Sequence, residues 1–194
     1  MTVPDLARRI QDRLPSTLDL LRDLVGINSY TGNRAGVNQL GRLTAERFAP
    51  LGFTAEFVPH QNSACGDHLV LTRPGTSPQS IALVSHLDTV FPPEEEERNG
   101  FRWQPEGPRI YGPGTIDIKG GTAMMHLALS ALAEADPETF QRITWRLLWN
   151  SSEETLSRDF AVLSHQRLDP SNTLAALVFE AEGRPAGTPC LVVA

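Results

Sequence analysis

Short apolar runs alternate with longer amphipathic stretches along this chain, and this alternation limits the possible folds more than any other feature. The runs are bounded by Pro, Gly, Asn and Ser, which is typical of strands. They lie at residues 53–58, 68–71, 81–85, 143–149, 174–179 and 190–193. Apolar residues at helical spacing predict helices at residues 6–25, 35–48, 121–135 and 157–167. We expect the first helix to break or kink near Pro15.

Strands that alternate with helices predict an α/β fold, with a mixed, largely parallel sheet covered by helices. A chain of 194 residues is expected to form one domain. It has 17 basic and 23 acidic residues, and this net charge of −6 disfavours nucleic-acid binding. No apolar run approaches the length of about 18 residues that a membrane span needs. The charged N-terminus lacks the apolar core of a signal peptide, so we expect a cytoplasmic protein.

Cysteines and the one acidic run are expected to have structural roles. Cys65 and Cys190 are too few for a disulfide scaffold and match no zinc-ribbon spacing. We therefore expect both to behave as small buried hydrophobic residues. The acidic run at residues 94–97 is typical of a solvated loop.

Acidic or imidazole groups follow a strand or a glycine-rich turn directly at four places. They are His86 and Asp88 in SHLDTVFP, Asp117 in YGPGTIDIKGG, Glu153 and Glu154 in NSSEETLS, and Glu180 and Glu182 in LVFEAEG. Ligands gather at the carboxyl ends of parallel strands, so we expect these groups at one edge of the sheet. Taken singly, each has an ordinary explanation as a turn, cap or solvated loop residue.

Together these groups favour a metal site. Several carboxylates around one imidazole would repel each other unless cations neutralise them, and both group types are zinc ligands. Two metals that share a carboxylate are the water-activating device of many hydrolases. A phosphate-binding loop is excluded, because Lys119 precedes the glycine pair of GPGTIDIKGGT instead of following the required spacing.

The four motifs, in this order, resemble the dizinc peptidase and amidohydrolase family. That family includes glutamate carboxypeptidase, aminoacylase, acetylornithine deacetylase and succinyl-diaminopimelate desuccinylase. The resemblance covers nearly the whole chain, and the GPG form of the second motif is most similar to the glutamate carboxypeptidase branch.

The resemblance implies a metal-binding role for four residues. His86 and Glu180 would bind one zinc ion, Asp117 would bridge both ions, and Glu154 would bind the second. Glu180 is preferred to Glu182 because it directly follows the predicted strand. Cobalt or manganese could replace zinc, since affinity alone does not fix the metal used in cells.

The resemblance also implies supporting roles around the metals. Asp88 would orient the His86 ring, and Glu153 would be the general base that moves a proton from water to the leaving amine. The peptide bond between Asp117 and Ile118 is expected to be cis. The remaining histidines match no ligand position and are interpreted as structural: His60, His68, His126 and His165.

By the same resemblance, the protein would hydrolyse an amide bond in an N-acyl amino acid or a small peptide with a free carboxylate. Its partner would be that small substrate, and the full-length form could be a homodimer. The alternative is a non-catalytic metal-binding fragment that needs a partner chain.

The family's chain continues beyond the segment that residues 1–194 resemble. In the family, a lid or dimerisation domain follows, and a later catalytic segment supplies a further His to the second zinc ion. We therefore expect residues 1–194 to be the N-terminal part of the catalytic domain, with the lid and the later segment absent. The first ion would have all its ligands here, while the second would lack its imidazole.

Overall fold

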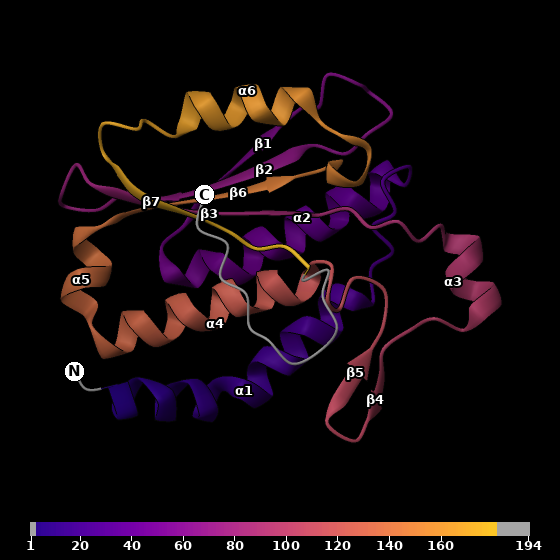
Figure 1. Ribbon diagram of the computed structural model, residues 1–194, viewed down its shortest axis with the longest axis horizontal. Helices are drawn as coiled ribbons and strands as arrows, with labels where there is room; N and C mark the ends of the chain where they lie inside the picture. The colour runs from indigo at the N-terminus through magenta and orange to yellow at the C-terminus, as the bar shows by residue number, and fades with distance from the viewer. Residues whose placement is uncertain (1–2, 182–194) are drawn as a thin grey trace.

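The computed structural model describes residues 3–181, which form a five-stranded mixed sheet with helices on both faces (Figure 1). The strands are β1 (Thr54–Val58), β2 (His68–Arg73), β3 (Ser80–His86), β6 (Thr144–Asn150) and β7 (Thr173–Val178), with β4 (Gln104–Glu106) and β5 (Arg109–Tyr111) in a separate hairpin. The helices are α1 (Val3–Val25), α2 (Arg34–Phe48), α3 (Pro93–Asn99), α4 (Lys119–Ala135), α5 (Pro137–Arg142) and α6 (Arg158–Arg167), with short 3₁₀ turns η1 (Ala49–Leu51) and η2 (Glu153–Thr155). The predicted fold class is confirmed.

The strand order is β1-β2-β6-β3-β7. β3 runs parallel to both β6 and β7, whereas β2 is antiparallel to β6 and β1 is antiparallel to β2. The parallel part therefore lies at the β7 side of the sheet, and the strands β3, β6 and β7 end at the same edge. The strand predicted at residues 190–193 lies outside the described residues, as does Cys190.

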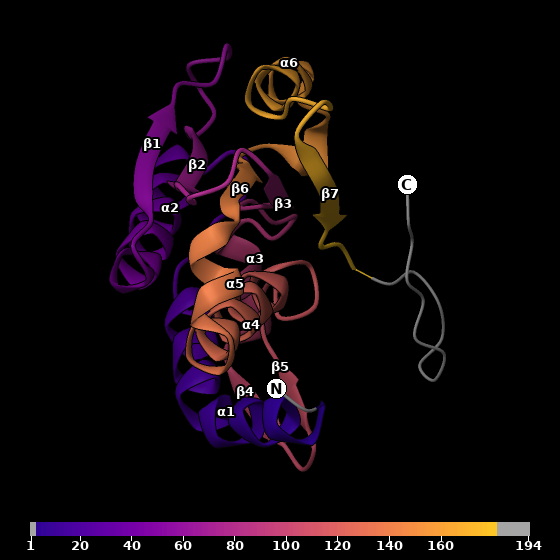
Figure 2. The same cartoon turned by 90° about the vertical axis from the view of Figure 1, so that its left-hand side faces the viewer.

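Two hydrophobic clusters hold the layers together. α1, α2 and α4 lie on one face of the sheet and α6 on the other (Figure 1), and Figure 2 shows the same separation from the side. Neighbouring residues of β6 point to opposite faces, as the period of a strand requires. Leu147 and Trp149 belong to the larger cluster, while Leu148 packs with Phe160 and Leu163 of α6.

α1 is one helix through Pro15, so it has no break there, although Figure 1 shows that its axis bends along its length. Proline disfavours the interior of a helix because it lacks an amide donor and crowds the preceding turn. Tertiary packing outweighs this preference here, since Leu20 and Leu24 are buried in the larger cluster. None of the helices within residues 3–181 is long and apolar enough to cross a membrane.

The acidic run at residues 94–97 lies in a short helix, α3, and the prediction of a loop was wrong. Pro93 occupies the first turn, where its missing amide proton costs nothing, and acids there complement the helix dipole. Gly100 ends the helix in the left-handed region at φ 56°. Cys65, expected to be buried, is half-buried and carries a free thiol.

Candidate metal centre

Three parallel strands bring polar side chains to one edge of the sheet. His86 is the last residue of β3 and pairs with Asn150, the last residue of β6. On its other side, Val84 pairs with Val178 at the end of β7, so Glu180 follows at the level of His86. The carboxyl ends of parallel strands are the usual place for ligand sites in α/β sheets.

His86, Asp117 and Glu180 meet at this edge. Nε2 of His86 lies 3.0 Å from Oδ1 of Asp117 and 3.6 Å from Oε2 of Glu180. One donor atom from each of the three residues lies within 4.8 Å of the other two. The imidazole is buried and both carboxylates are partly exposed. The structure therefore brings together the three residues predicted to bind the first ion, while Glu182 lies outside the described residues.

Asp117 is placed by the glycine-rich turn that leads into α4. The peptide bond between Asp117 and Ile118 is cis, as the resemblance implied. Gly114 adopts φ +78°, in the left-handed region that glycine enters without steric cost. A Cβ atom at Gly114 would also lie 2.9 Å from the side chain of Lys119, so this position requires glycine on both grounds.

Lys119 contributes to this turn in a way that the sequence analysis missed. Its side chain is nearly fully buried, and Nζ donates a hydrogen bond to the carbonyl oxygen of Ile27 at 2.8 Å. Burial lowers the pKa of Lys119 to about 8. The bond ties the Asp117 turn to the segment that follows α1. Its partner is 92 residues away in the sequence, so no local pattern indicates it.

Asp88 connects His86 to the turn that carries the two glutamates. Nδ1 of His86 lies 3.0 Å from the backbone oxygen of Asp88 and 3.4 Å from its Oδ1. The same Oδ1 accepts the backbone N–H of Glu153 at 2.9 Å, and Oδ2 accepts that of Glu154 at 3.3 Å. Oδ2 also accepts the hydroxyl of Thr31 at 2.7 Å. The sequence indicated the contact of Asp88 with His86 but not the three hydrogen bonds from Glu153, Glu154 and Thr31.

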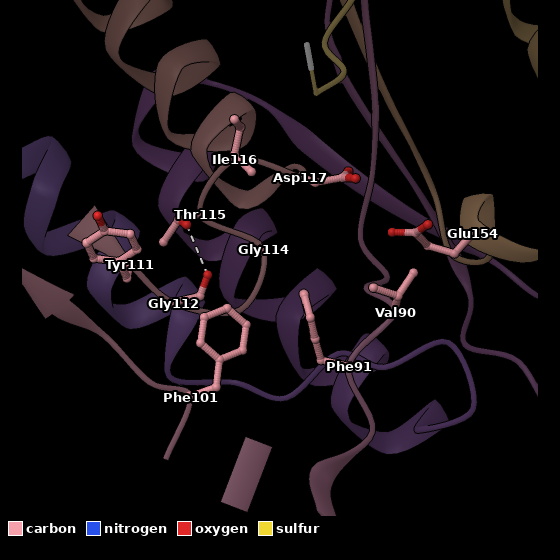
Figure 3. Close-up of a pocket in the computed structure, with 10 residues that line it drawn as sticks. All are labelled: Val90, Phe91, Phe101, Tyr111, Gly112, Gly114, Thr115, Ile116, Asp117 and Glu154. Atoms are coloured by element: carbon pink, nitrogen blue, oxygen red, sulfur yellow. Dashed lines mark hydrogen bonds between the residues drawn. The ribbon is translucent and has the colours of Figure 1, made fainter. Parts of the chain in front are cut away.

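Glu153 and Glu154 lie on η2, directly after β6. Figure 3 shows the carboxylates of Glu154 and Asp117 pointing toward each other across the mouth of a pocket. Glu154 is half-buried, whereas Glu153 is exposed. The structure therefore places Glu154 opposite the cluster of His86, Asp117 and Glu180.

The electrostatics of the site favour bound positive charge. Burial opposes protonation of His86, but hydrogen bonding and charge at Asp88, with Glu180 and Asp117 nearby, raise its pKa to about 9. Burial raises the pKa of Glu154 to about 7, and the charge of Asp117 adds to this rise. In the absence of a metal, the raised pKa values mean that His86 and Glu154 hold protons, which a bound cation would replace. One imidazole surrounded by carboxylates fits a divalent metal such as zinc.

A cavity of about 350 Å³ lies beside the acidic groups (Figure 3). Asp117 and Glu154 contribute its polar wall. The rest of the lining is mainly apolar and aromatic: Val90, Phe91, Phe101, Tyr111, Gly112, Gly114, Thr115 and Ile116. The site therefore combines a charged end that can hold metal with an apolar space next to it.

This combination of an α/β sheet with imidazole and carboxylate donors at its edge is typical of metal-dependent hydrolases. Residues 82–189 match the model of peptidase family M20/M25/M40, and the chain belongs to this family. The family predicted from the four motifs is confirmed.

Known relatives agree with this assignment. The chain is 32% identical to carboxypeptidase G2 of Pseudomonas sp. (strain RS-16), over 74% of this chain and 34% of that protein. It is 34% identical to succinyl-diaminopimelate desuccinylase of Thioalkalivibrio sulfidiphilus, over 73% of this chain and 36% of that protein. The chain therefore spans about a third of the length of these curated relatives.

The structure of human carnosine dipeptidase 1 has a similar fold. Its TM-score is 0.72 at 17% identity, and the match covers 89% of this chain and 40% of that one. At this level of identity, the similarity establishes the arrangement of helices and strands.

Proposed function

We propose that the protein is a metal-dependent hydrolase of amide bonds, which acts on a small peptide or an N-acyl amino acid with a free carboxylate. The observation that carries this proposal is the meeting of His86, Asp117 and Glu180 opposite Glu154, in a chain of the M20 family. The relatives that the chain matches include proteins named as a carboxypeptidase and as a desuccinylase.

The residues present would supply all the expected ligands of one zinc ion and two carboxylates for a second. His86, Asp117 and Glu180 would bind one ion, and Asp117 with Glu154 would bind the other. When bound, zinc polarises the scissile carbonyl and lowers the pKa of water, so that a stronger nucleophile is available at neutral pH. Asp117 lies close to His86 on one side and to Glu154 on the other, so it is the residue that both ions would share.

Glu153 is proposed as the general base. It would take a proton from the attacking water and deliver it to the nitrogen of the leaving amine. Its side chain is exposed beside the cluster, and its backbone N–H is fixed by Oδ1 of Asp88. Asp88 would thus orient both the imidazole of His86 and the turn that carries the base.

The apolar cavity is proposed to receive an apolar acyl or side-chain group of the substrate. Phe91 and Phe101 meet in its wall with ring centroids 4.8 Å apart, close to perpendicular. Such a wall offers dispersion contacts and no charged partner. Substrates with larger apolar groups should therefore be hydrolysed with a lower KM than their acetyl counterparts.

The test uses Glu153→Gln in the complete protein, with zinc, on a panel of dipeptides and N-acyl amino acids with acyl groups of increasing size. We expect kcat to fall by about 10²- to 10⁴-fold, with the zinc content unchanged. Glu138→Gln, at an exposed position of α5, is the matched control. Zinc binding without turnover on any member of the panel would instead favour a metal-binding module that needs a partner chain.

A further inference from the structure

A second group of polar side chains lies where the loop after β1 meets the start of α6. It consists of His60 in that loop, His68 at the start of β2, and Asp159 in the first turn of α6. Donor atoms of the three residues lie within 4.8 Å of one another. His68 is 1% exposed, and the other two side chains are about one-tenth exposed. This close grouping could be a metal site or a hydrogen-bonded structure.

The hydrogen bonds of the two rings argue against a metal at this place. Nδ1 of His60 accepts the backbone N–H of Asn62 at 2.8 Å, and Nδ1 of His68 accepts that of Ser151 at 3.1 Å. A nitrogen that accepts from an amide carries no proton, so each neutral ring has its proton on Nε2. A metal bound to Nε2 would need that proton on Nδ1 instead. The rings are set to donate from Nε2.

The Nε2 atoms face Ser152 and Asp159. Nε2 of His60 lies 2.8 Å from the hydroxyl oxygen of Ser152 and 3.5 Å from Oδ1 of Asp159. Nε2 of His68 lies 3.3 Å from Oδ2 of Asp159. The carboxylate also accepts the backbone N–H of Gln61 at 2.8 Å. Burial opposes ionisation of Asp159, but hydrogen bonds from the Gln61 amide, the Ser157 hydroxyl and the His68 ring hold its pKa well below its usual range.

His60 thus bonds one end of a short segment, residues 152–159, at Ser152 and lies close to Asp159 at the other end; the segment contains Glu153 and Glu154. Within this segment Leu156 adopts φ 62°, in the left-handed region that a leucine rarely occupies. A turn held in an unfavourable conformation depends on contacts at its ends. Here those contacts are the hydroxyl of Ser152 at one end and the carboxylate of Asp159 at the other.

The group does not have the geometry of a nucleophilic triad, although it contains Ser, His and Asp. In such a triad the carboxylate and the hydroxyl face opposite nitrogens of the imidazole. Here Ser152 and Asp159 both face Nε2 of His60, and Ser152 is buried. Ser152 is therefore not an accessible nucleophile.

We propose that His60 and Asp159 are positioning residues for the hydrolytic site, acting through Ser152 on Glu153. His60 fixes Ser152 from one side of the turn, and Asp88 holds the backbone N–H groups of the turn from the other. Neither His60 nor Asp159 lines the cavity proposed to receive the substrate. This proposal rests on the role of Glu153 stated above.

The first test compares His60→Ala with His60→Gln in the complete zinc-loaded protein. The loss of the ring frees Ser152, and displacement of a catalytic group by about 1 Å can cost 10²-fold in rate. We therefore expect His60→Ala to lower kcat by about 100-fold, with KM and zinc content unchanged, and the amide donor of His60→Gln to restore part of it. His165→Ala, at an exposed histidine of α6, is the control.

A double-mutant cycle tests the route through Ser152. Ser152→Ala should lower kcat as His60→Ala does, and the double variant should be no slower than either single variant, because the two residues form one contact. Additive losses would overturn the proposal, as would a kcat of His60→Ala equal to the wild type. If His60→Ala has the kcat of the wild type while Glu153→Gln is inactive, the positioning proposal fails and the proposed hydrolytic function is still supported.

Hydrogen exchange gives a readout that does not depend on activity. If the complete protein has no hydrolytic activity, the positioning proposal still predicts faster exchange at the amides of Glu153 and Glu154 in His60→Ala and Asp159→Asn, and unchanged exchange in His165→Ala. Unchanged exchange in all variants would contradict it. Zinc that persists in Asp117→Ala but is lost in His60→Ala would also overturn it, by identifying a metal site.

Discussion

At the scale of single residues, Asp88 links three parts of the candidate site. Its carboxylate receives two backbone N–H groups from the turn of Glu153 and Glu154, and the hydroxyl of Thr31. It also lies beside Nδ1 of His86. One buried carboxylate therefore orients a proposed metal ligand and shapes the turn that holds the proposed base.

Asp88→Asn tests this arrangement with almost no change of shape. The new amide cannot accept hydrogen bonds at both ends, so one backbone N–H of the turn would face another donor. We expect zinc affinity to fall by about 10- to 100-fold, measured by calorimetric titration. Asp19→Asn, on the exposed side of α1, should leave the affinity unchanged. Equal affinities for Asp88→Asn and the wild type would contradict the proposed role.

A second prediction at this scale concerns His126 of α4. Its ring packs edge-on against Phe48 with centroids 5.1 Å apart, and Nε2 donates to the carbonyl of Arg47. Burial lowers the pKa of His126 below 6.5. Between the lowered pKa and 6.5 the unfolded chain binds more protons than the folded one. The contribution of neutral His126 to the free energy of unfolding is therefore fully present above pH 6.5. It is lost as the pH falls through the lowered pKa that His126 has in the folded protein.

His126→Gln keeps an amide donor but cannot titrate. We expect the free energy of unfolding to fall less steeply on acidification in this variant than in the wild type. Urea unfolding between about pH 5 and pH 8 measures the difference. Parallel pH profiles for the two proteins would show that His126 does not carry the predicted linkage.

At the scale of elements, the strands and the proposed metal ligands could be predicted from the sequence for one reason. A strand of this sheet appears as a short apolar run, and the ligand side chains lie at its end or just beyond it, as His86 and Glu180 do. Contacts between distant segments have no such local signal. The bond from His60 to Ser152 spans 92 residues, so the sequence analysis interpreted His60 as structural without indicating its partner.

Propensity alone was also insufficient for some elements. The hairpin of β4 and β5 lies in a stretch rich in Pro, Gly and Glu, for which the sequence analysis predicted no strand. α1 continues through Pro15 because its apolar face is buried. In both cases pairing or packing with other parts of the chain decided the outcome, and a local pattern does not contain that information.

The turn that leads into α4 fixes the position of Asp117. A Cβ atom at Gly120 would lie 2.3 Å from the backbone oxygen of Thr115. We expect Gly120→Ala to lower the free energy of unfolding by about 1–3 kcal/mol and to weaken zinc binding, because the turn must move. The control is Gly26→Ala, whose nearest atoms would lie at an ordinary 3.5 Å. Unchanged zinc binding in Gly120→Ala would contradict this prediction, because it would show that the metal site does not depend on the position of this turn.

At the scale of the whole molecule, β7 forms an edge of the sheet within residues 3–181. Leu174, Leu177 and Val178 on this strand are all exposed. Unpaired strand edges with apolar side chains favour association with another chain. The relatives of this chain are about three times as long as the part that it matches.

We therefore expect the 194-residue chain to self-associate with increasing concentration, and Leu177→Lys to reduce this association. A charge on an edge strand opposes pairing with a neighbouring edge. Sedimentation velocity over a concentration series measures the effect. Val162→Lys, an exposed position on α6, is the control. Association that is unchanged in Leu177→Lys, or reduced equally in Val162→Lys, would contradict a role of β7.

The central claim is that His86, Asp117, Glu154 and Glu180 form a metal centre. Elemental analysis of the purified chain, after zinc loading and dialysis against a weak chelator, tests it most directly. The account predicts retention of at least about one zinc ion per chain, loss of zinc in Asp117→Ala, and retention in the control Asp67→Ala, just before β2. A chain that retains no zinc, or the same zinc content in Asp117→Ala as in the wild type, would contradict it.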